Sequence, residues 1–192
     1  MPRIVEYPLV ADEMLGLGME SLYHNSGAFG FPRGTASETV AWIGPPDETI
    51  RAASRPLTRA VPPPYERNLA ALARAAWETH LPGRAWVMPK SHWAYELDFG
   101  SAEWMPAVLR GLGLDDEYLT RQNDGSAIGF APDEADAYAR TVEQLLANLR
   151  GSDFTLAWPG RPVVCTLHHH KQLWWTTTDA TLAAALRGMT PT

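Results

Sequence analysis

The stretch FTLAWPGRPVVCTLHHHKQLWWTTT, residues 154–178, contains three short runs rich in aromatic and β-branched side chains. Such side chains favour strands over helices. The Pro-Gly pair at 159–160 ends the first run, and the polar HHHK segment separates the second run from the third. The sequence therefore predicts three consecutive strands in a meander, and the other elements are placed around this sheet.

Helical periodicity and further alternating runs surround the meander. Apolar side chains recur at helical spacing in residues 61–83, 103–112 and 131–151, and a short helix is expected at 181–189. Alternation predicts strands at 91–99 and 126–130. The order after residue 62 is therefore α-β-α-β-α-β-β-β-α. This order predicts an α+β fold in two layers, in which a mainly antiparallel sheet of about five strands carries two or three amphipathic helices on one face.

The N-terminal third looks different from the rest of the chain. Residues 1–62 are rich in proline and glycine and predict an irregular segment, with a weak helix at 10–23 and one short strand at 39–43. A chain of 192 residues is long enough to bury one core. We therefore expect a single domain spanning residues 1–192.

Composition limits the function classes. The net charge of -6 disfavours binding to a phosphate backbone, so nucleic acid is not an expected partner. A single cysteine, Cys165, excludes an internal disulfide and lies in an apolar neighbourhood typical of an inert core thiol. No apolar run approaches the roughly 18 residues that span a bilayer, and the first residues lack the apolar core of a signal peptide. These features predict a cytoplasmic protein without membrane contact, and arginine far outnumbers lysine, as in GC-rich bacterial genes.

The histidine row suggests a metal site if the second strand continues through it. Side chains alternate along a strand, so Val163, Cys165 and Leu167 would face the helix-covered core. His168 and His170 would then face the open side of the sheet. Residues two apart on a strand are about 6.6 Å apart, so both imidazoles can reach one ion.

The predicted strand at 91–99 offers the remaining ligands. Its alternation places His92, Glu96 and Asp98 on one face. Any one of the three could complete a His/carboxylate set suited to zinc or non-haem iron(II), and an unused carboxylate, Glu96 or Asp98, could act as general base. If HHHK instead forms the hairpin itself, the shared face is lost, and an open sheet face also carries histidine without any ion.

Two function classes therefore remain open. The first is a non-catalytic protein that binds a protein or small-molecule ligand on an open sheet face bearing histidine and aromatic side chains, with Tyr95, Trp174 and Trp175 as anchors. Adjacent strand residues point to opposite faces, so one of the two tryptophans is expected outside the core, where it could also form a homodimer contact. The second is a metal-dependent enzyme, a hydrolase or non-haem oxygenase, built on the histidine row.

Overall fold

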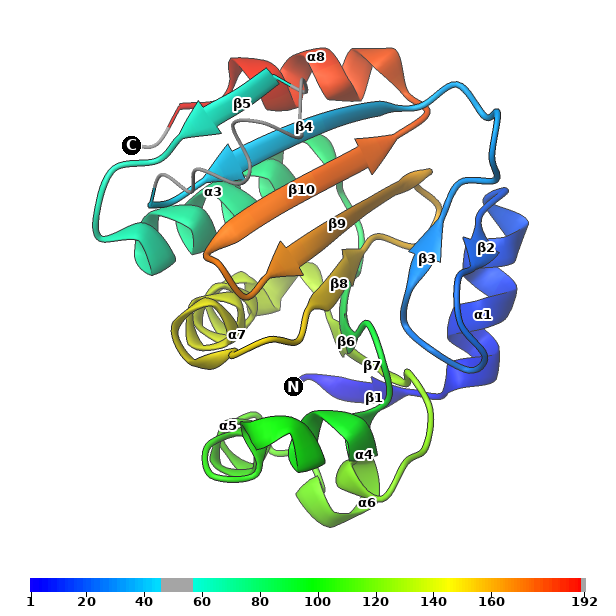
Figure 1. Cartoon of the computed structure of the whole chain (residues 1–192), viewed down its shortest axis with the longest axis vertical. Coiled ribbons are helices and arrows are strands. Elements are labelled where there is room, and N and C mark those ends of the chain that lie inside the picture. Colours follow the sequence, from blue (N-terminus) through cyan, green and yellow to red (C-terminus); the bar gives the residue numbers. More distant parts are fainter. Residues whose placement is uncertain (46–56, 191–192) are drawn as a thin grey trace.

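The computed structural model describes residues 1–45 and 57–190, and its centre is one eight-stranded sheet (Figure 1). In their order across the sheet, the strands are β1 (Arg3–Val5), β7 (Ala127–Phe130), β6 (Ala85–Pro89), β8 (Phe154–Ala157), β9 (Val163–His168), β10 (Gln172–Thr177), β4 (Glu38–Ile43) and β5 (Leu57–Ala60). All neighbours are antiparallel except β4 and β5, which are parallel. The α+β class and the meander are confirmed.

The estimate of about five strands is too low because the N-terminal third contributes to the sheet. Strands β1, β4 and β5 all come from residues 1–62, so the prediction that this segment is irregular is wrong. The strand expected at 39–43 is confirmed as β4. Strands β1 and β5 have three and four residues, and runs this short carry too few alternations to stand out in a sequence.

Three amphipathic helices cover one face of the sheet, but the predicted total of two or three helices is too low, because the described residues form further helices elsewhere. The three covering helices are α3 (Tyr65–His80), α7 (Ala135–Asn148) and α8 (Ala180–Gly188), and their apolar sides share one core with the strands. A short 3-10 turn, η2 (Pro132–Glu134), leads into α7. The other helices are α1 (Tyr7–Gly16), α4 (Trp93–Glu96), α5 (Met105–Gly111) and α6 (Asp116–Thr120). None of the helices in the described residues has the length and apolar character needed to cross a membrane.

The second face of the sheet is not fully open, contrary to the expectation. Helix α1 and the small hairpin of β2 (Glu20–Ser21) and β3 (Phe29–Gly30) pack against part of it, at the right of Figure 1. Val10 and Met14 of α1 belong to the same buried cluster as Trp86 and Val164 of the sheet. Thr166, His168 and Trp174 lie farther along this face and stay partly exposed.

The strand predicted at 91–99 is wrong. Strand β6 ends at Pro89, and the chain then forms α4 and a π-helical turn, η1 (Leu97–Ser101). Trp93 is fully buried, and its indole N–H donates to the carbonyl oxygen of Ser126 at 2.6 Å. Tyr95 and Phe99 stack on each other, which the four-residue spacing of a helix allows and a strand does not. In a segment this short, aromatic residues at every second position fit both the two-residue repeat of a strand and the four-residue spacing of a helix. The alternation alone therefore does not distinguish the two structures.

Candidate site at the histidine turn

The three histidines lie where β9 turns into β10. His168 pairs with Gln172, so residues 169–171 form a three-residue hairpin loop. The N–H of Lys171 donates to the His168 carbonyl oxygen at 3.0 Å, and Lys171 has a positive φ of 59°. A tight turn followed by one left-handed residue is a common form of three-residue hairpin. The histidine row is thus a turn rather than a continued strand, which removes the shared face of His168 and His170.

Neighbouring elements hold this turn in place. Lys171 occupies a left-handed conformation that costs a non-glycine residue about 1–3 kcal/mol. Its Nζ lies 2.5 Å from Oε1 of Glu66 on α3, and its carbonyl oxygen accepts the N–H of Gly44 at 3.0 Å. The contact with Lys171 lowers the pKa of the Glu66 carboxyl. A turn anchored from two sides keeps its side chains in a defined arrangement.

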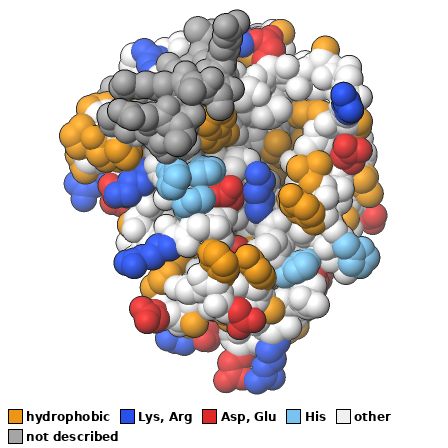
Figure 2. Space-filling view, in the orientation of Figure 1, with side chains coloured by type: hydrophobic (Ala, Val, Ile, Leu, Met, Phe, Trp, Pro, Cys, Tyr) orange, Lys and Arg blue, Asp and Glu red, His pale blue; other side chains and the backbone are white. Residues whose placement is uncertain are grey.

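The turn gathers the three imidazole rings into one cluster. Ring centroids are 4.2 Å apart for His168 and His169, 4.3 Å for His169 and His170, and 5.0 Å for His168 and His170. One ring nitrogen from each residue lies within 4.8 Å of the other two. Figure 2 shows histidine side chains gathered on the face of the molecule in view. Three rings so close cannot all be protonated without strong repulsion.

Burial keeps His168 neutral. It lowers the pKa of the His168 imidazole, and the nearby charges of His169, His170 and Lys90 lower it further, while Asp153 opposes them. A neutral imidazole is the form that binds metal ions or accepts a proton. The His168 ring therefore presents a nitrogen lone pair rather than a positive charge at neutral pH.

Asp153 orients the middle histidine. Nδ1 of His169 lies 3.0 Å from Oδ1 of Asp153, and the backbone N–H of His169 donates to the same oxygen at 3.2 Å. An ionised carboxylate only accepts, so this contact places the His169 proton on Nδ1 and leaves a lone pair on Nε2. The same arrangement orients histidine ligands in many metal sites. Asp153 is in turn held by the Lys90 N–H, which donates to its carbonyl oxygen at 2.9 Å.

His168 needs a small rearrangement before it can bind an ion. Its Nδ1 accepts the backbone N–H of His170 at 3.1 Å, so in the neutral ring Nε2 carries the proton. Tetrahedral zinc has Zn–N bonds of about 2.0–2.1 Å, which places its nitrogen ligands roughly 3.4 Å apart. The present span of 4.8 Å must therefore shorten by about 1.4 Å. Rotation of partly exposed rings supplies such a movement for the loss of one hydrogen bond, about 1 kcal/mol.

The other residues proposed as ligands do not join this cluster. Among residues 1–45 and 57–190, the group able to share one ion consists of His168, His169 and His170. His92 Nε2 instead lies 3.0 Å from the carbonyl oxygen of His24. Asp98 is exposed on the π-helical turn η1. Because residues 93–101 are helical, the face that would have joined these groups to Glu96 does not exist.

Glu96 is a buried acid that contacts the residue next to Asp153. It is 1% exposed and accepts hydrogen bonds from the hydroxyls of Ser91 at 2.8 Å and Ser152 at 2.5 Å. Burial raises the pKa of the Glu96 carboxyl, the two serine hydrogen bonds oppose this, and the negative charge of Asp153 raises it further. Ser152 directly precedes Asp153 in the chain. The hydrogen bond between Ser152 and Glu96 therefore helps to fix the segment that carries the Asp153 carboxylate.

The raised pKa of Glu96 predicts a pH-dependent effect of the substitution Glu96→Gln. A carboxyl whose pKa is higher in the folded state stabilises the fold below its unfolded pKa, and this contribution is lost as pH rises through the folded pKa. The amide does not ionise. The free energy of unfolding of E96Q, relative to that of wild type, is therefore expected to increase between about pH 4 and pH 7. Urea titrations across this range measure it, with exposed Glu103→Gln as the control, and parallel pH profiles for E96Q and wild type would contradict it.

The three aromatic residues proposed as anchors have different surroundings. Trp175 is 0% exposed, with its ring centroid 5.1 Å from those of both Trp42 and Trp158. Trp174 is partly exposed on the other face, and its indole N–H donates to Oε1 of Gln172 at 2.8 Å. The opposite orientation of the two tryptophans is confirmed. Tyr95 is 47% exposed, so it and Trp174 are accessible to a ligand, whereas Trp175 is not.

Thiol chemistry has no place in this site. Cys165 is fully buried in β9, and burial raises the pKa of its thiol well above the ordinary range. A buried protonated thiol is a weak nucleophile. Cys165 therefore serves the core, as its apolar neighbourhood indicates.

Comparison of the chain with protein-family models, with curated proteins and with solved structures finds no match. The chemistry of the histidine turn is therefore the basis for a functional proposal.

Proposed function

We propose that the histidine turn binds a divalent transition-metal ion, zinc first and iron(II) second, and that the protein is a metal-dependent hydrolase. The observation that carries the proposal is the convergence of ring nitrogens from His168, His169 and His170 within 4.8 Å of one another. Imidazole nitrogen suits zinc and iron, and three protein ligands with one open position are typical of catalytic zinc.

The surroundings of the turn suit a reaction at an open metal position. His170 is exposed, and the His169 side chain keeps 23% of its surface accessible, so a water molecule and a small substrate can reach the ion. Zinc lowers the pKa of a bound water to about 7. Asp153 contacts Nδ1 of the His169 ring, which leaves the Nε2 lone pair for an ion. These residues thus supply ligands, orientation and access.

Metal content tests the proposal with a control that the chain itself provides. Three of its six histidines form the turn, and the other three are His24, His80 and His92. Protein purified without a histidine tag is expected to hold about one metal equivalent, which is the stoichiometry of a single site. The variant H168A/H169A/H170A should lose this metal, whereas H24A/H80A/H92A should keep it. Absence of metal in wild type, with none taken up from added zinc or iron(II), would overturn the proposal.

A second candidate function is non-catalytic ligand binding at the same turn. It is favoured by the hydrogen bond from the His170 N–H to Nδ1 of His168, because that bond occupies a lone pair that a metal ion would need. In this alternative, the polar turn and the exposed Tyr95 recognise a ligand directly. Metal content distinguishes the two candidate functions, since only the metal-dependent hydrolase requires a metal ion.

A further inference from the structure

We propose that the ligand of this site is a small anion that carries a planar aromatic ring, such as an aryl phosphate or an aryl carboxylate. This inference rests on the proposed function, and it adds the chemical class of the substrate. Two features next to the histidine turn carry it. They are an exposed pair of stacked aromatic rings and two basic side chains.

The aromatic pair is formed by Tyr95 and Phe99. Their centroids are 5.3 Å apart, the ring planes are inclined by 17°, and the side chains are 47% and 48% exposed. Two nearly parallel rings that both remain half exposed offer an apolar surface to a third ring. Stacking on such a surface is tolerant of the detailed structure of the ring, because every planar ring has a π face.

This pair is connected to the histidine turn through residues 151–153. A Cβ placed on Gly151 would lie 2.9 Å from Cε1 of Phe99, so the Phe99 ring packs on the backbone of Gly151. Two residues later, Asp153 contacts His169. Two residues of chain span about 7 Å at most. The Phe99 ring and the carboxylate that contacts His169 are therefore tied to backbone positions no more than about 7 Å apart, which is the basis for one small ligand reaching both.

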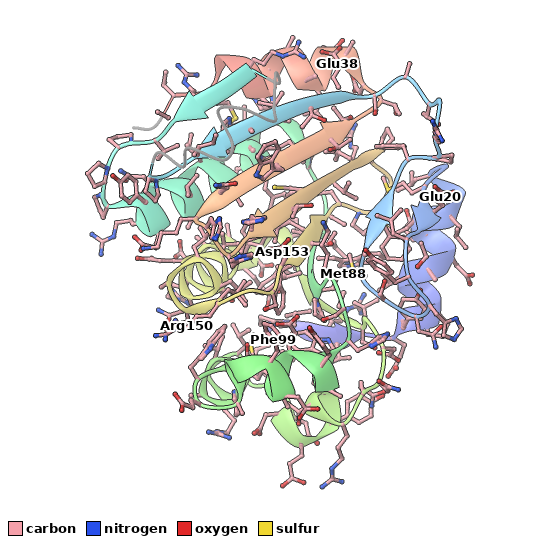
Figure 3. The ribbon with its side chains drawn as sticks, in the orientation of Figure 1. Glu20, Glu38, Met88, Phe99, Arg150 and Asp153 are labelled. Carbon is pink, nitrogen blue, oxygen red and sulfur yellow. The ribbon has the colours of Figure 1, made fainter. Side chains whose placement is uncertain are left out.

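The labelled side chains of Figure 3 agree with this arrangement. Asp153, Phe99 and Arg150 appear on the same part of the molecule, with Phe99 and Arg150 on the same side of Asp153. Arg150 directly precedes Gly151, on which Phe99 packs. The basic side chain is therefore attached to the chain one residue before the glycine on which the Phe99 ring packs.

Two basic side chains give the surface its preference for an anion. Lys90 lies within electrostatic reach of His168, and Arg150 is exposed. Within the described part of the chain, neither side chain forms an ion pair or hydrogen bond, whereas Lys171 is paired with Glu66. Unpaired cations near the histidine turn, in a protein of net charge -6, make a local site for a phosphate or carboxylate.

Calorimetric titration with three small probes tests the inference. Phenylphosphonate carries both the ring and the anion, inorganic phosphate carries only the anion, and phenol carries only the ring. Phenylphosphonate is expected to bind zinc-supplemented protein about tenfold more tightly than either partial probe, which is the size of one stacking contact. Benzoate in a parallel titration shows whether the site prefers a carboxylate to a phosphonate.

Variants assign the two contributions to their residues. Phe99→Leu keeps an apolar side chain against Gly151 but removes the π face, so it should lose the tenfold advantage and leave phosphate affinity unchanged. Arg150→Ala should weaken both anionic probes. Tyr118→Ala is the matched control, because Tyr118 is 40% exposed and its hydroxyl donates to Glu6, which belongs to neither the histidine turn nor the aromatic pair.

Failure of the inference is distinguishable from failure of the metal proposal. If phenylphosphonate and phosphate bind equally, or if Phe99→Leu has no effect, the inference is overturned even in protein that holds zinc. If phenylphosphonate still binds more tightly than phosphate and phenol after a chelator has removed the metal, the proposed ligand class is supported without the metal. The metal proposal is then decided by the metal-content measurement alone.

Discussion

Replacing Trp175 with alanine is expected to lower the free energy of unfolding by about 3 kcal/mol. The ring is 0% exposed and packs between those of Trp42 and Trp158, each with its centroid at 5.1 Å. Loss of a buried tryptophan costs about 3–5 kcal/mol because a cavity remains. The lower end applies here, since the Trp175 indole N–H is buried without a hydrogen-bond partner among the described residues and its removal recovers part of the loss.

The neighbouring tryptophan is the control for this prediction. Trp174→Ala removes a ring of the same size from the other face of β10, where it is partly exposed and donates one hydrogen bond to Gln172. The expected loss is about 1 kcal/mol. Urea unfolding followed by circular dichroism gives both values. Equal losses, or a larger loss for Trp174→Ala, would contradict the assignment of Trp175 to the core face.

The sequence predicts the elements in which the repeat of apolar side chains is clear. Helix α7 and the three strands of the meander each show a clear repeat of apolar side chains, and they occur where that repeat places them. The segment from Trp93 to Phe99 shows why short runs fail. Its aromatic alternation also satisfies the four-residue spacing of a helix, and contacts with Ser126 and Phe154 decide in favour of the helix.

The site residues that the sequence does not reveal are His169 and Asp153. If β9 continued through residue 170, the His169 side chain would point to the core face. The strand ends at His168 instead, and the hairpin turn brings the His169 ring against that of His168. Asp153 precedes β8, and no spacing links it to a histidine 16 residues later. The antiparallel register that pairs Phe154 with Leu167 creates this contact, and register is a property of the folded sheet.

Asp153→Asn is expected to weaken zinc binding by about 10- to 100-fold, the usual effect of removing a carboxylate that orients a histidine ligand. The amide has nearly the same shape, so its oxygen can still accept the backbone N–H of His169 and the hairpin should fold. The negative charge is lost, however, and with it the preference for a proton on Nδ1 of His169 and a basic lone pair on Nε2. Competition with a chromogenic chelator measures the affinity in purified wild type and variant.

Asp98→Asn separates this orienting effect from a general loss of negative charge. Asp98 is an exposed carboxylate on η1, outside the histidine cluster, and its substitution changes the net charge by the same amount as Asp153→Asn. Zinc affinity is expected to stay within about twofold of wild type in D98N, because exposed charges at a distance are screened by salt. Equal weakening in both variants would mean that charge alone attracts the ion. An unchanged affinity in D153N would mean that His169 binds zinc without its carboxylate partner, or that the ion lies elsewhere, and either result removes Asp153 from the site.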